Sequence, residues 1–431
     1  MAEPRLDPPV AVTEIAARLE QAGYETWCVG GAVRDALLGL RHLDWDLATA
    51  ATPPQVRRLF RRTVPVGEAF GTIGVLDTLG HMHEVTTFRH DVKTDGRHAE
   101  VEFGASLDED LARRDFTINA MAWSPSRHQL HDPFGGRADL ARRTVRAVGD
   151  APTRMAEDRL RALRAIRFAA RFGFAIEPAT WAAIVASAPA LHRLSRERIQ
   201  QELVKTLEQV RRPGDALVLW EASGALAALL PPLAGRTEWQ YRAADRRALP
   251  DDASRDHVAK RRVLVRLGAV VAGLAPEVVR SLLTGLRFAS RDVQRTARLV
   301  EVASLIAPVL EAGGVVGDAT FRRWAAAAHR PDTADAMRIA ISLNQARRGA
   351  PDVVAHRWGR DYRRAIRVAF RDPVALADLA VDGEDLARVG VRAGPAVGAM
   401  LRRLLDHVLE HPETNQVEAL LGLAREWQDS H

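Results

Sequence analysis

Strand-forming segments are confined to the first third of this 431-residue chain, and this asymmetry limits its possible folds more than any other feature. From about Val12 to Val148, helical patterns alternate with short apolar runs such as "GTIGVLD" and "HMHEVTTFR". Those two runs are joined at Asp77–Gly80 and predict two strands with a hairpin-like connection. Beyond Pro152 apolar residues recur at helical spacing and the strand signals stop. The sequence predicts an α+β fold, with a small mixed sheet plus helices followed by a long all-α arm.

Pro, Gly and polar residues interrupt the helical pattern at several points and suggest where the chain divides. Breaks are expected near residues 173–174, 213–214 and 231–232, and the polar run at 235–262 is expected to be a loop or hinge. The predicted domains are a head at residues 1–150, a helical neck at 151–215, a helical body at 216–340 and a helical tail at 341–431.

The segment "VRAGPAVGAMLRRLLDHVLEHP" predicts a helix that begins at Gly394-Pro395, because proline is tolerated in the first turn. Its apolar residues recur at helical spacing and are expected to pack in a core. They are Val397, Met400, Leu401, Leu404, Leu405, Val408 and Leu409.

Composition limits the class of protein. The formal charge is +6 and the pI is about 10.1, so a polyanionic partner is plausible. However, only three of the 61 basic residues are lysines, and a GC-rich genome would produce the same excess of arginine. Cys28 is the only cysteine, which excludes a disulfide framework and a cysteine-based zinc site. The N-terminus lacks a signal-peptide pattern, and no apolar run is long enough to cross a bilayer. We therefore expect a soluble, cytoplasmic protein with no membrane contact.

Two carboxylates, Asp44 and Asp46, follow a glycine-glycine turn in "VGGAVRDALLGLRHLDWDL". On a strand, residues i and i+2 point to the same face, and two adjacent carboxylates repel unless a cation such as Mg²⁺ lies between them. Gly30 and Gly31 allow the backbone to approach an anion, and Arg34 adds a phosphate-binding fork. Each motif alone is common at turns and strand ends, but their ordered combination indicates nucleotide triphosphate chemistry.

Two further blocks carry charged residues that suit a nucleotide. Arg113 and Arg114 in "EDLARRDFTINAMAW" could neutralise a triphosphate, or they could form an ordinary surface pair with Asp115. Four charged residues recur every three positions in "TRMAEDRLRALRAIRFAARFGF": Asp158, Arg161, Arg164 and Arg167. Such rows usually make intrahelical ion pairs. However, a carboxylate beside an arginine would also accept cytosine and adenine, which both present an amine beside a ring acceptor. It would reject uracil and guanine, which present a carbonyl where the amine would be.

Together these blocks resemble the bacterial-type (class II) tRNA nucleotidyltransferases, which include CCA-adding enzymes and related poly(A) polymerases. The matching stretches also include "EVTTFR", "DPFGGRADL" and "LSRERIQQEL", and they follow the family's order across residues 28–203. The resemblance implies a polymerase-β-like head, a neck that recognises the nucleotide base, and a helical tail at 341–431 that binds tRNA. The partner would be the tRNA acceptor end, and the substrates would be CTP and ATP. It implies that two Mg²⁺ ions act in nucleotidyl transfer that adds or repairs the 3′-terminal CCA without a nucleic-acid template.

The resemblance also assigns roles to individual positions. Asp44 and Asp46 would hold the metal, and Glu84 stands where a third catalytic carboxylate is found. The nucleotide-binding positions would be Gly31, Arg34, Arg114, Asp158, Arg161, Arg164 and Arg167. Glu197 and Arg198 match a motif thought to brace the neck helices. Residues 90–108 match a flexible element that enables the switch from C to A.

One departure and several alternatives remain. Many relatives carry a His-Asp phosphohydrolase signature where this chain reads Val271-Ala272-Gly273, so we predict no phosphohydrolase activity. His81 and His83 alternate on a strand and are expected to be solvated rather than metal-bound. A CC-only or A-only enzyme, a poly(A) polymerase and a non-catalytic RNA-binding paralogue stay open, and the sequence does not indicate the oligomeric state.

Overall fold

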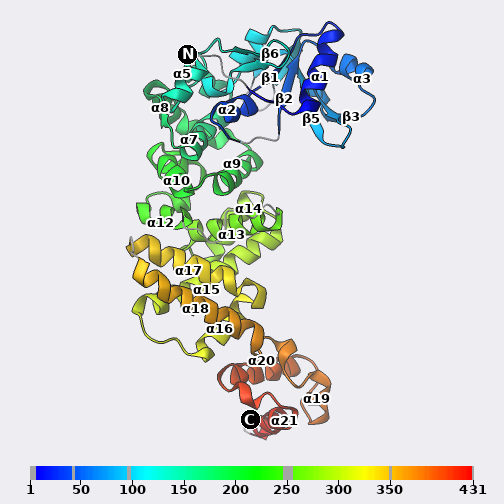
Figure 1. Ribbon diagram of the computed structural model, residues 1–431. Helices are drawn as coiled ribbons and strands as arrows, with labels where there is room; N and C mark the ends of the chain where they lie inside the picture. The colour runs from blue at the N-terminus through cyan, green and yellow to red at the C-terminus, as the bar shows by residue number, and fades with distance from the viewer. Residues whose placement is uncertain (1–5, 41–43, 95–98, 246–255, 349–351, 430–431) are drawn as a thin grey trace. The chain divides into compact units, whose positions relative to one another are not determined.

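The computed structural model describes residues 6–40, 44–94, 99–245, 256–348 and 352–429 (Figure 1). The chain divides into two compact units, one comprising residues 1–202 with 219–231 and the other residues 203–218 with 232–431. A mixed sheet lies in the first unit and the rest of the chain is mainly helical, as the sequence predicts. The four-domain division stays a prediction. Within the described residues, no helix is long and apolar enough to cross a membrane.

The first unit is built on a seven-stranded sheet with the order β3-β4-β5-β2-β1-β8-β9. The β2–β5 pair is parallel and the other neighbouring pairs are antiparallel. The strands are β1 Thr26–Val29, β2 Asp46–Thr49, β3 Thr63–Gly67, β4 Thr72–Leu76, β5 Met82–Thr87, β8 Ala122–Ser124 and β9 Gln129–His131. A separate antiparallel pair, β6 Arg89–Thr94 and β7 Ala99–Phe103, begins one residue before the segment 90–108 and takes up much of it; residues 95–98 lie outside the described part.

Helices surround the sheet and continue beyond it. Those before residue 150 are α1 Val10–Gln21, α2 Gly31–Leu37, α3 Pro53–Leu59, α4 Leu107–Ala112 and α5 Gly136–Ala141, with a 3₁₀ turn η2 at Thr117–Asn119. The following helices are α6 Ala151–Glu157, α7 Leu160–Phe172, α8 Pro178–Ser187, α9 Arg196–Gln209, α10 Pro213–Ala222 and α11 Ala225–Leu229. The buried core between sheet and helices includes Trp27, Phe88 and Leu111.

The strand signals do not end entirely at Pro152. A two-residue strand, β11 Ala175–Ile176, follows α7 and pairs in parallel with β10 Thr144–Val145. Gly173 ends α7 with φ +66°, a left-handed conformation that suits glycine and turns the chain into this short pairing. Two residues carry no readable alternation, so sequence periodicity misses such a strand.

The second unit is all-helical within the described residues. Its helices are α12 Glu238–Arg242, α13 Asp256–Val271, α14 Pro276–Gly285, α15 Ser290–Ala312, α16 Asp318–Ala328, α17 Thr333–Arg348, α18 Asp352–Arg371, α19 Gly383–Arg388, α20 Pro395–Glu410 and α21 Val417–Asp429. Trp358, Phe321 and Met337 lie in its main core. The loop predicted at 235–262 is wrong for 238–245, which α12 and a 3₁₀ turn occupy, and for 256–262, where α13 begins; residues 246–255 lie outside the described part. A capping box at Thr237 and Gln240 starts α12.

The predicted C-terminal helix is confirmed. Helix α20 begins at Pro395 after Gly394, whose φ of +100° favours glycine. Leu404 and Val408 are buried against α19 and α21, and Leu409 joins a neighbouring apolar cluster. The apolar stripe is therefore core, as its spacing predicts.

Candidate functional site

Carboxylates from two neighbouring strands meet at one end of the sheet. Asp46 is the first residue of β2, and the parallel register Leu47↔Val85 brings it beside Glu84 on β5. Asp44 lies before the strand and is exposed, while Trp45 between them is buried. The prediction that both aspartates lie on a strand is thus wrong for Asp44. The side chains nevertheless alternate as in an extended segment: Trp45 is buried, and the carboxylates on either side of it are more exposed.

The charges at this end of the sheet are mostly of one sign. Burial, and after it the neighbouring Glu84 and Asp44, raise the pKa of Asp46 to about 6, although Arg114 acts in the opposite direction. Like charges held this closely favour a bound cation. Nowhere in the described part of the chain do three or more His, Cys, Asp or Glu side chains form a group that could hold a metal ion.

This donor set fits Mg²⁺ better than it fits a metal enclosed by protein ligands. Magnesium is usually bound by one or two carboxylates, with water and substrate phosphates as its other ligands. Asp44 and Asp46 are the carboxylates that could serve in this way, and Glu84 on β5 is next to Asp46. The acidic cluster, defined as Asp44, Asp46 and Glu84, therefore matches a metal that is shared with a triphosphate.

A glycine turn and an arginine lie next to the acidic cluster. Gly30 follows β1, which pairs with β2 through Val29↔Asp46, and its φ of +74° is one that L side chains rarely adopt. A Cβ added at Gly30 would stand 2.8 Å from Nη1 of Arg114, so the backbone lies directly against that guanidinium. Arg114 donates to Asp110 at 3.0 Å, and its buried Nε has no hydrogen-bond partner. Gly31 begins α2 at this point, and the turn leaves backbone amides and a guanidinium beside the carboxylates.

Arg34 lies inside the protein rather than at an open surface. Only 3% of it is exposed; its Nε donates to Asp35 at 2.7 Å and its Nη1 donates to Asn119 at 2.5 Å. Its guanidinium also lies over the rings of Phe168 and Phe172, at 5.0 and 4.8 Å from their centroids. Burial lowers the pKa of Arg34, and Asp35 opposes that effect. Arg34 thus ties α2 to η2 and to α7.

Arg164 extends the same buried network. Its Nε donates to Asp115 at 2.8 Å, and Asn119 donates to the other oxygen of that carboxylate at 2.8 Å. Burial alone would raise the pKa of Asp115, but Arg164 holds it below its ordinary value. The alternative prediction that Asp115 pairs with Arg113 or Arg114 is wrong, because those two arginines donate to Asp110. The network joins the segment after α4 to α7.

Asp158 and Arg161 lie near each other in sequence but are bonded to different partners. Asp158 separates α6 from α7, and both of its oxygens accept from Nη2 of Arg198, at 2.9 and 2.7 Å. Arg161 donates to Glu157 at 2.7 Å and to the carbonyl of Arg113 at 2.9 Å. The structure therefore does not show Asp158 and Arg161 as a direct pair.

Arg198 is the residue here that sequence reasoning undervalued. Its resemblance to a bracing motif agrees with a bond between α9 and the α6–α7 junction. The separation from Asp158 is 40 residues, and no local pattern signals that their side chains meet. Arg167 belongs to a similar brace: its Nε donates to Glu202 at 2.8 Å, and both side chains are buried.

The expectation that His81 and His83 are both solvated residues of a strand is wrong: His81 is exposed but precedes β5, and His83 on β5 is buried. His83 is buried and its Nε2 lies 3.3 Å from Asp77, while the exposed His81 places its Nδ1 3.4 Å from the same carboxylate. Asp77 lies in the β4–β5 turn, where it also accepts from the amide of Leu79 at 2.9 Å. These contacts stabilise the turn.

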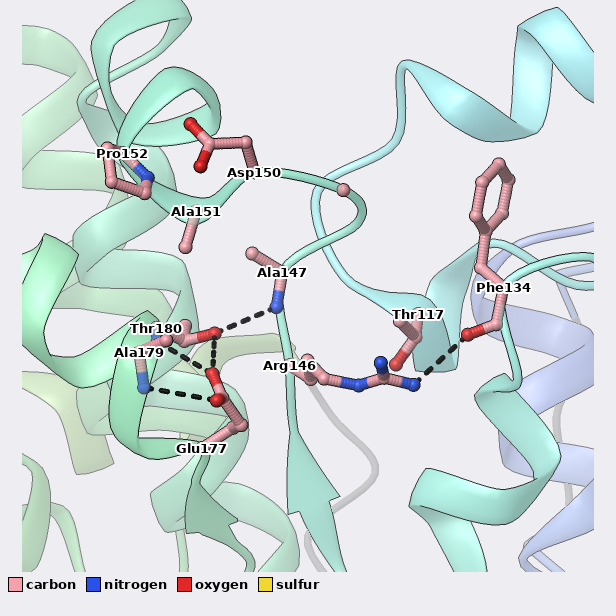
Figure 2. Close-up of a pocket in the computed structure, with 11 residues that line it drawn as sticks. Thr117, Phe134, Arg146, Ala147, Asp150, Ala151, Pro152, Glu177, Ala179 and Thr180 are labelled. Carbon is pink, nitrogen blue, oxygen red and sulfur yellow. Dashed lines mark hydrogen bonds between the residues drawn. The ribbon is translucent and has the colours of Figure 1, made fainter.

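A separate pocket of about 370 Å³ lies between the end of the head and α8 (Figure 2). Phe134 and Arg146 line one side of it and Glu177 and Thr180 line the other, as Figure 2 shows. The two Glu177 oxygens cap α8 by accepting from the amides of Ala179 and Thr180. No member of the acidic cluster, nor any predicted nucleotide-binding residue, lines this pocket.

Comparison with known protein families shows which class of enzyme this chain resembles. The family model described as the poly A polymerase head domain matches residues 26–146, which contain the acidic cluster, Gly30 and Arg114. A second model, described as the probable RNA and SrmB-binding site of polymerase A, matches residues 173–235. The chain is a nucleotidyltransferase.

Full-length relatives narrow the class to a family. The CCA-adding enzyme of Limosilactobacillus fermentum is 35% identical over 425 residues, covering 96% of this chain and 95% of that protein. The CCA-adding enzyme of Geobacillus stearothermophilus is 36% identical over 413 residues and covers 94% of each. A crystal structure of the Bacillus stearothermophilus CCA-adding enzyme in complex with CTP is 33% identical, covers 97% of each chain and superposes with a TM-score of 0.77. This chain belongs to the CCA-adding enzyme family.

Proposed function

We propose that this protein transfers cytidylate and adenylate from CTP and ATP to the 3′ end of tRNA, building or repairing its terminal CCA without a nucleic-acid template. The observation that carries the proposal is the acidic cluster beside Gly30 and Arg114 at one end of the sheet. Full-length relatives at 33–36% identity, one of them solved with CTP, support the choice of reaction. The Thermotoga maritima CCA-adding enzyme complexed with tRNA, at 21% identity, supports the fold only.

The acidic cluster would hold Mg²⁺, with Asp44 and Asp46 as ligands and Glu84 as a third carboxylate. When bound, the metal lowers the pKa of the attacking hydroxyl and neutralises charge on the phosphates. The tRNA 3′-hydroxyl attacks the α-phosphorus and loses its proton, one P–O bond forms, and the bond to pyrophosphate breaks. Gly31 leaves room for the triphosphate, and Arg114 lies where it can bind a phosphate oxygen.

Asp158 and Arg161 would select the base. A carboxylate has about four lone-pair positions, so Asp158 can accept from an exocyclic amine while Arg198 still donates to it. A uracil or guanine carbonyl at that point would be repelled by Asp158. Arg161 would contribute donors to the ring acceptor, from a guanidinium held by Glu157.

The remaining predicted residues would act by positioning. Arg34 is bonded to Asp35 and Asn119, so we propose that it orients α2 and Gly31 for the nucleotide. Arg164 and Arg167 would hold α7 through Asp115 and Glu202. We propose four domains with the bounds that the sequence predicts: head 1–150, neck 151–215, body 216–340 and tail 341–431.

A gel extension assay tests the proposal. Labelled tRNA ending at the discriminator base, at C or at CC is incubated with protein, Mg²⁺ and each nucleotide alone or CTP with ATP. We expect addition of C-C-A that then stops, with no use of UTP or GTP. Arrest at CC would instead identify a CC-only enzyme, and extension of only the CC-ended tRNA by one A an A-only enzyme.

Two outcomes would replace the proposal with another function. A long A tail on unrelated RNA would identify a poly(A) polymerase. No extension of any substrate by a protein that still binds tRNA would identify a non-catalytic RNA-binding paralogue.

A further inference from the structure

Asp110 is a buried carboxylate in the last turn of α4 that binds two arginines at once. Only 1% of it is exposed, and the sequence did not predict it as part of the site. Its Oδ1 accepts from Nε and Nη2 of Arg113 at 3.0 and 2.8 Å, and its Oδ2 accepts from Nη2 of Arg114 at 3.0 Å. Burial alone would raise the pKa of Asp110, but Arg114 and Arg113 hold it below its ordinary value. The carboxylate is therefore charged at neutral pH.

The short helix that carries Asp110 is fixed at both ends. At its start, Ser106 and Glu109 form a capping box. At its end, Arg154 of α6 donates to the carbonyl of Ala112 at 3.1 Å. Asp110 thus projects from a helix that its neighbours hold in place, and it can in turn hold the side chains that bond to it.

The guanidinium of Arg114 lies between Asp110 and the acidic cluster. Its Nη2 bonds to Asp110, while its Nη1 lies against Gly30, where an added Cβ would be 2.8 Å away. Arg114 also lowers the pKa of Asp46, so its charge acts on the acidic cluster. In the described part of the chain, Arg114 has an ion pair with Asp110, and none is recorded with Asp46 or Glu84.

The two arginines use Asp110 differently. Arg113 places two of its donors on one oxygen, so it clamps the carboxylate. Arg114 places only one donor on the other oxygen. Its Nη1 has no hydrogen-bond partner among the described residues, so this donor stays available to an anion at the Gly30 turn. A phosphate oxygen suits a guanidinium donor well.

An arginine side chain is long and loses much conformational freedom when it is fixed, so it needs a partner to stay in one place. Without Asp110, the nearest anions for Arg114 would be the carboxylates of the acidic cluster. An ion pair between Arg114 and Asp46 would occupy the carboxylate that is proposed to bind the metal, and it would withdraw the guanidinium from the Gly30 turn.

We propose that Asp110 is a positioning residue, which holds Nη2 of Arg114 so that Nη1 meets the triphosphate of the incoming nucleotide and stays off the acidic cluster. This inference rests on the proposed function, which places the triphosphate beside the glycine turn. Asp110 touches neither the nucleotide nor the metal and acts only through Arg114.

The experiment asks whether Asp110 acts on triphosphate binding or on the fold alone. Affinities for CTP and for cytidine are measured by isothermal titration calorimetry with Mg²⁺ and without tRNA. The proteins are wild type, Asp110→Asn, Arg114→Gln and the double variant. Asp139→Asn is the matched control, since Asp139 is also buried in the first unit and accepts from Arg146 at 2.8 Å. Urea denaturation gives the stability of each protein.

We expect Asp110→Asn to bind CTP about tenfold more weakly and to bind cytidine within about twofold of wild type, because only CTP carries the phosphates that Arg114 would contact. The double variant should bind CTP within about twofold of Arg114→Gln, since losses at residues that act as one unit do not add. The control should lose stability and keep its preference for CTP over cytidine.

A second variant keeps the test valid if Asp110→Asn does not fold. Asp110→Glu retains the charge that pairs with both arginines but moves the carboxylate by one methylene. We expect it to fold, to bind CTP about threefold more weakly and to bind cytidine normally. Normal CTP affinity in Asp110→Glu beside an unfolded Asp110→Asn would overturn the proposal, because the charge would then serve the fold alone.

Equal losses of CTP and cytidine affinity in Asp110→Asn would also overturn the proposal, as would additive losses in the double variant or the same loss of CTP preference in Asp139→Asn. The outcomes separate from those of the proposed function. A wild type that extends tRNA beside an Asp110→Asn variant with normal CTP preference refutes only the positioning role. A wild type that does not extend tRNA, beside an Asp110→Asn variant that has lost its CTP preference, refutes only the transfer reaction.

Discussion

The acidic cluster of the first unit and the buried aspartates Asp332 and Asp335 of the second unit have opposite surroundings. In the first, Asp46 lies beside Glu84 and near Asp44, and burial followed by these neighbours raises its pKa to about 6. In the second, the fully buried Asp335 accepts from Arg261 at 2.8 Å and from Arg338 at 2.9 Å.

Asp332 shares this arginine-rich surrounding. Arg295 lies 2.8 Å from Asp332 and 3.1 Å from Asp335, and Arg298 lies 3.0 Å from Asp332. A buried charge is costly unless it is paired, and here the protein supplies the counter-ions itself. In the acidic cluster of the first unit, Arg114 is the cation that lowers the pKa of Asp46, and burial with Glu84 and Asp44 outweighs it. The difference separates carboxylates that hold the fold from carboxylates that, as we propose, bind a metal.

The largest expected effect is on catalysis. Asp46→Asn keeps the shape of the side chain but removes a metal ligand, so the extension rate should fall at least about 10³-fold, or about 4 kcal/mol of barrier. Folding should be retained, because the substitution also relieves repulsion from Glu84. Single-turnover extension of tRNA, with circular dichroism as the folding control, measures both. A loss below about tenfold would remove Asp46 from the proposed site.

The next effect is on stability. Asp335→Asn leaves Arg261, Arg295 and Arg338 without their shared carboxylate, and breaking a buried pair in this way costs about 3–5 kcal/mol. Urea denaturation followed by circular dichroism measures the change. The control is Asp318→Asn, which breaks an exposed pair with Arg364 and should change stability by about 0.5 kcal/mol or less. If the two variants behave alike, the second unit does not depend on its arginine-bonded aspartates.

Base choice should respond less strongly. Asp158→Asn replaces an acceptor by a group that can also donate, so UTP use relative to CTP should rise by about 10- to 100-fold. Arg198→Lys should preserve the preference but weaken nucleotide binding, since the two bonds to Asp158 reduce to one point charge. Competition between CTP and UTP on one tRNA gives the ratio. An unchanged ratio in Asp158→Asn would refute the assignment of Asp158.

The smallest expected effect concerns Asp245, a carboxylate of the second unit whose buried oxygen, unlike those of Asp332 and Asp335, has no arginine within hydrogen-bond distance. Burial raises its pKa to about 6, and its buried Oδ2 has no hydrogen-bond partner. The folded state therefore binds the proton more tightly than the unfolded state, whose carboxyl keeps the ordinary value of 3.8. Stability from this group is present below pH 3.8 and is lost as the pH rises through about 6.

Asp245→Asn should therefore be more stable than wild type at pH 8, by about 2 kcal/mol or less, and equal to it at pH 4. The variant can still accept from the amide of Gly214, as Asp245 does. Urea denaturation at pH 4, 6 and 8 gives the difference at each pH. A variant less stable than wild type at pH 8 would mean that Arg212 stabilises the carboxylate despite a separation of 3.8 Å.

Sequence periodicity predicted most of the individual helices and strands, but it did not predict which of them pack together. The β4–β5 hairpin and the start of α20 are local features set by turn residues and by Gly394-Pro395, so they could be predicted. The stretch 238–245 was misassigned because its polar composition hides a capping box at Thr237. Local chemistry decides such cases more reliably than hydropathy.

In the candidate site, too, the sequence predicted the residues but not their partners in space. Asp46 was found from its spacing to Asp44, but its contact with Glu84 depends on a parallel pairing between distant strands. Arg34 was found as a cation, yet no pattern shows that Phe168, Phe172 and Asn119 enclose it. Residue type and periodicity assign a face, whereas the partner on that face follows only from the tertiary fold.

Metal binding tests the contrast between the two units most directly. Free Mn²⁺ is measured by electron paramagnetic resonance as it is titrated into wild type, Asp46→Asn and Asp318→Asn in the presence of CTP, with Mg²⁺ as competitor. We predict that wild type and Asp318→Asn bind Mn²⁺ that Mg²⁺ displaces, and that Asp46→Asn binds it at least about tenfold more weakly. Equal binding by Asp46→Asn and wild type would show that the acidic cluster is not the metal site.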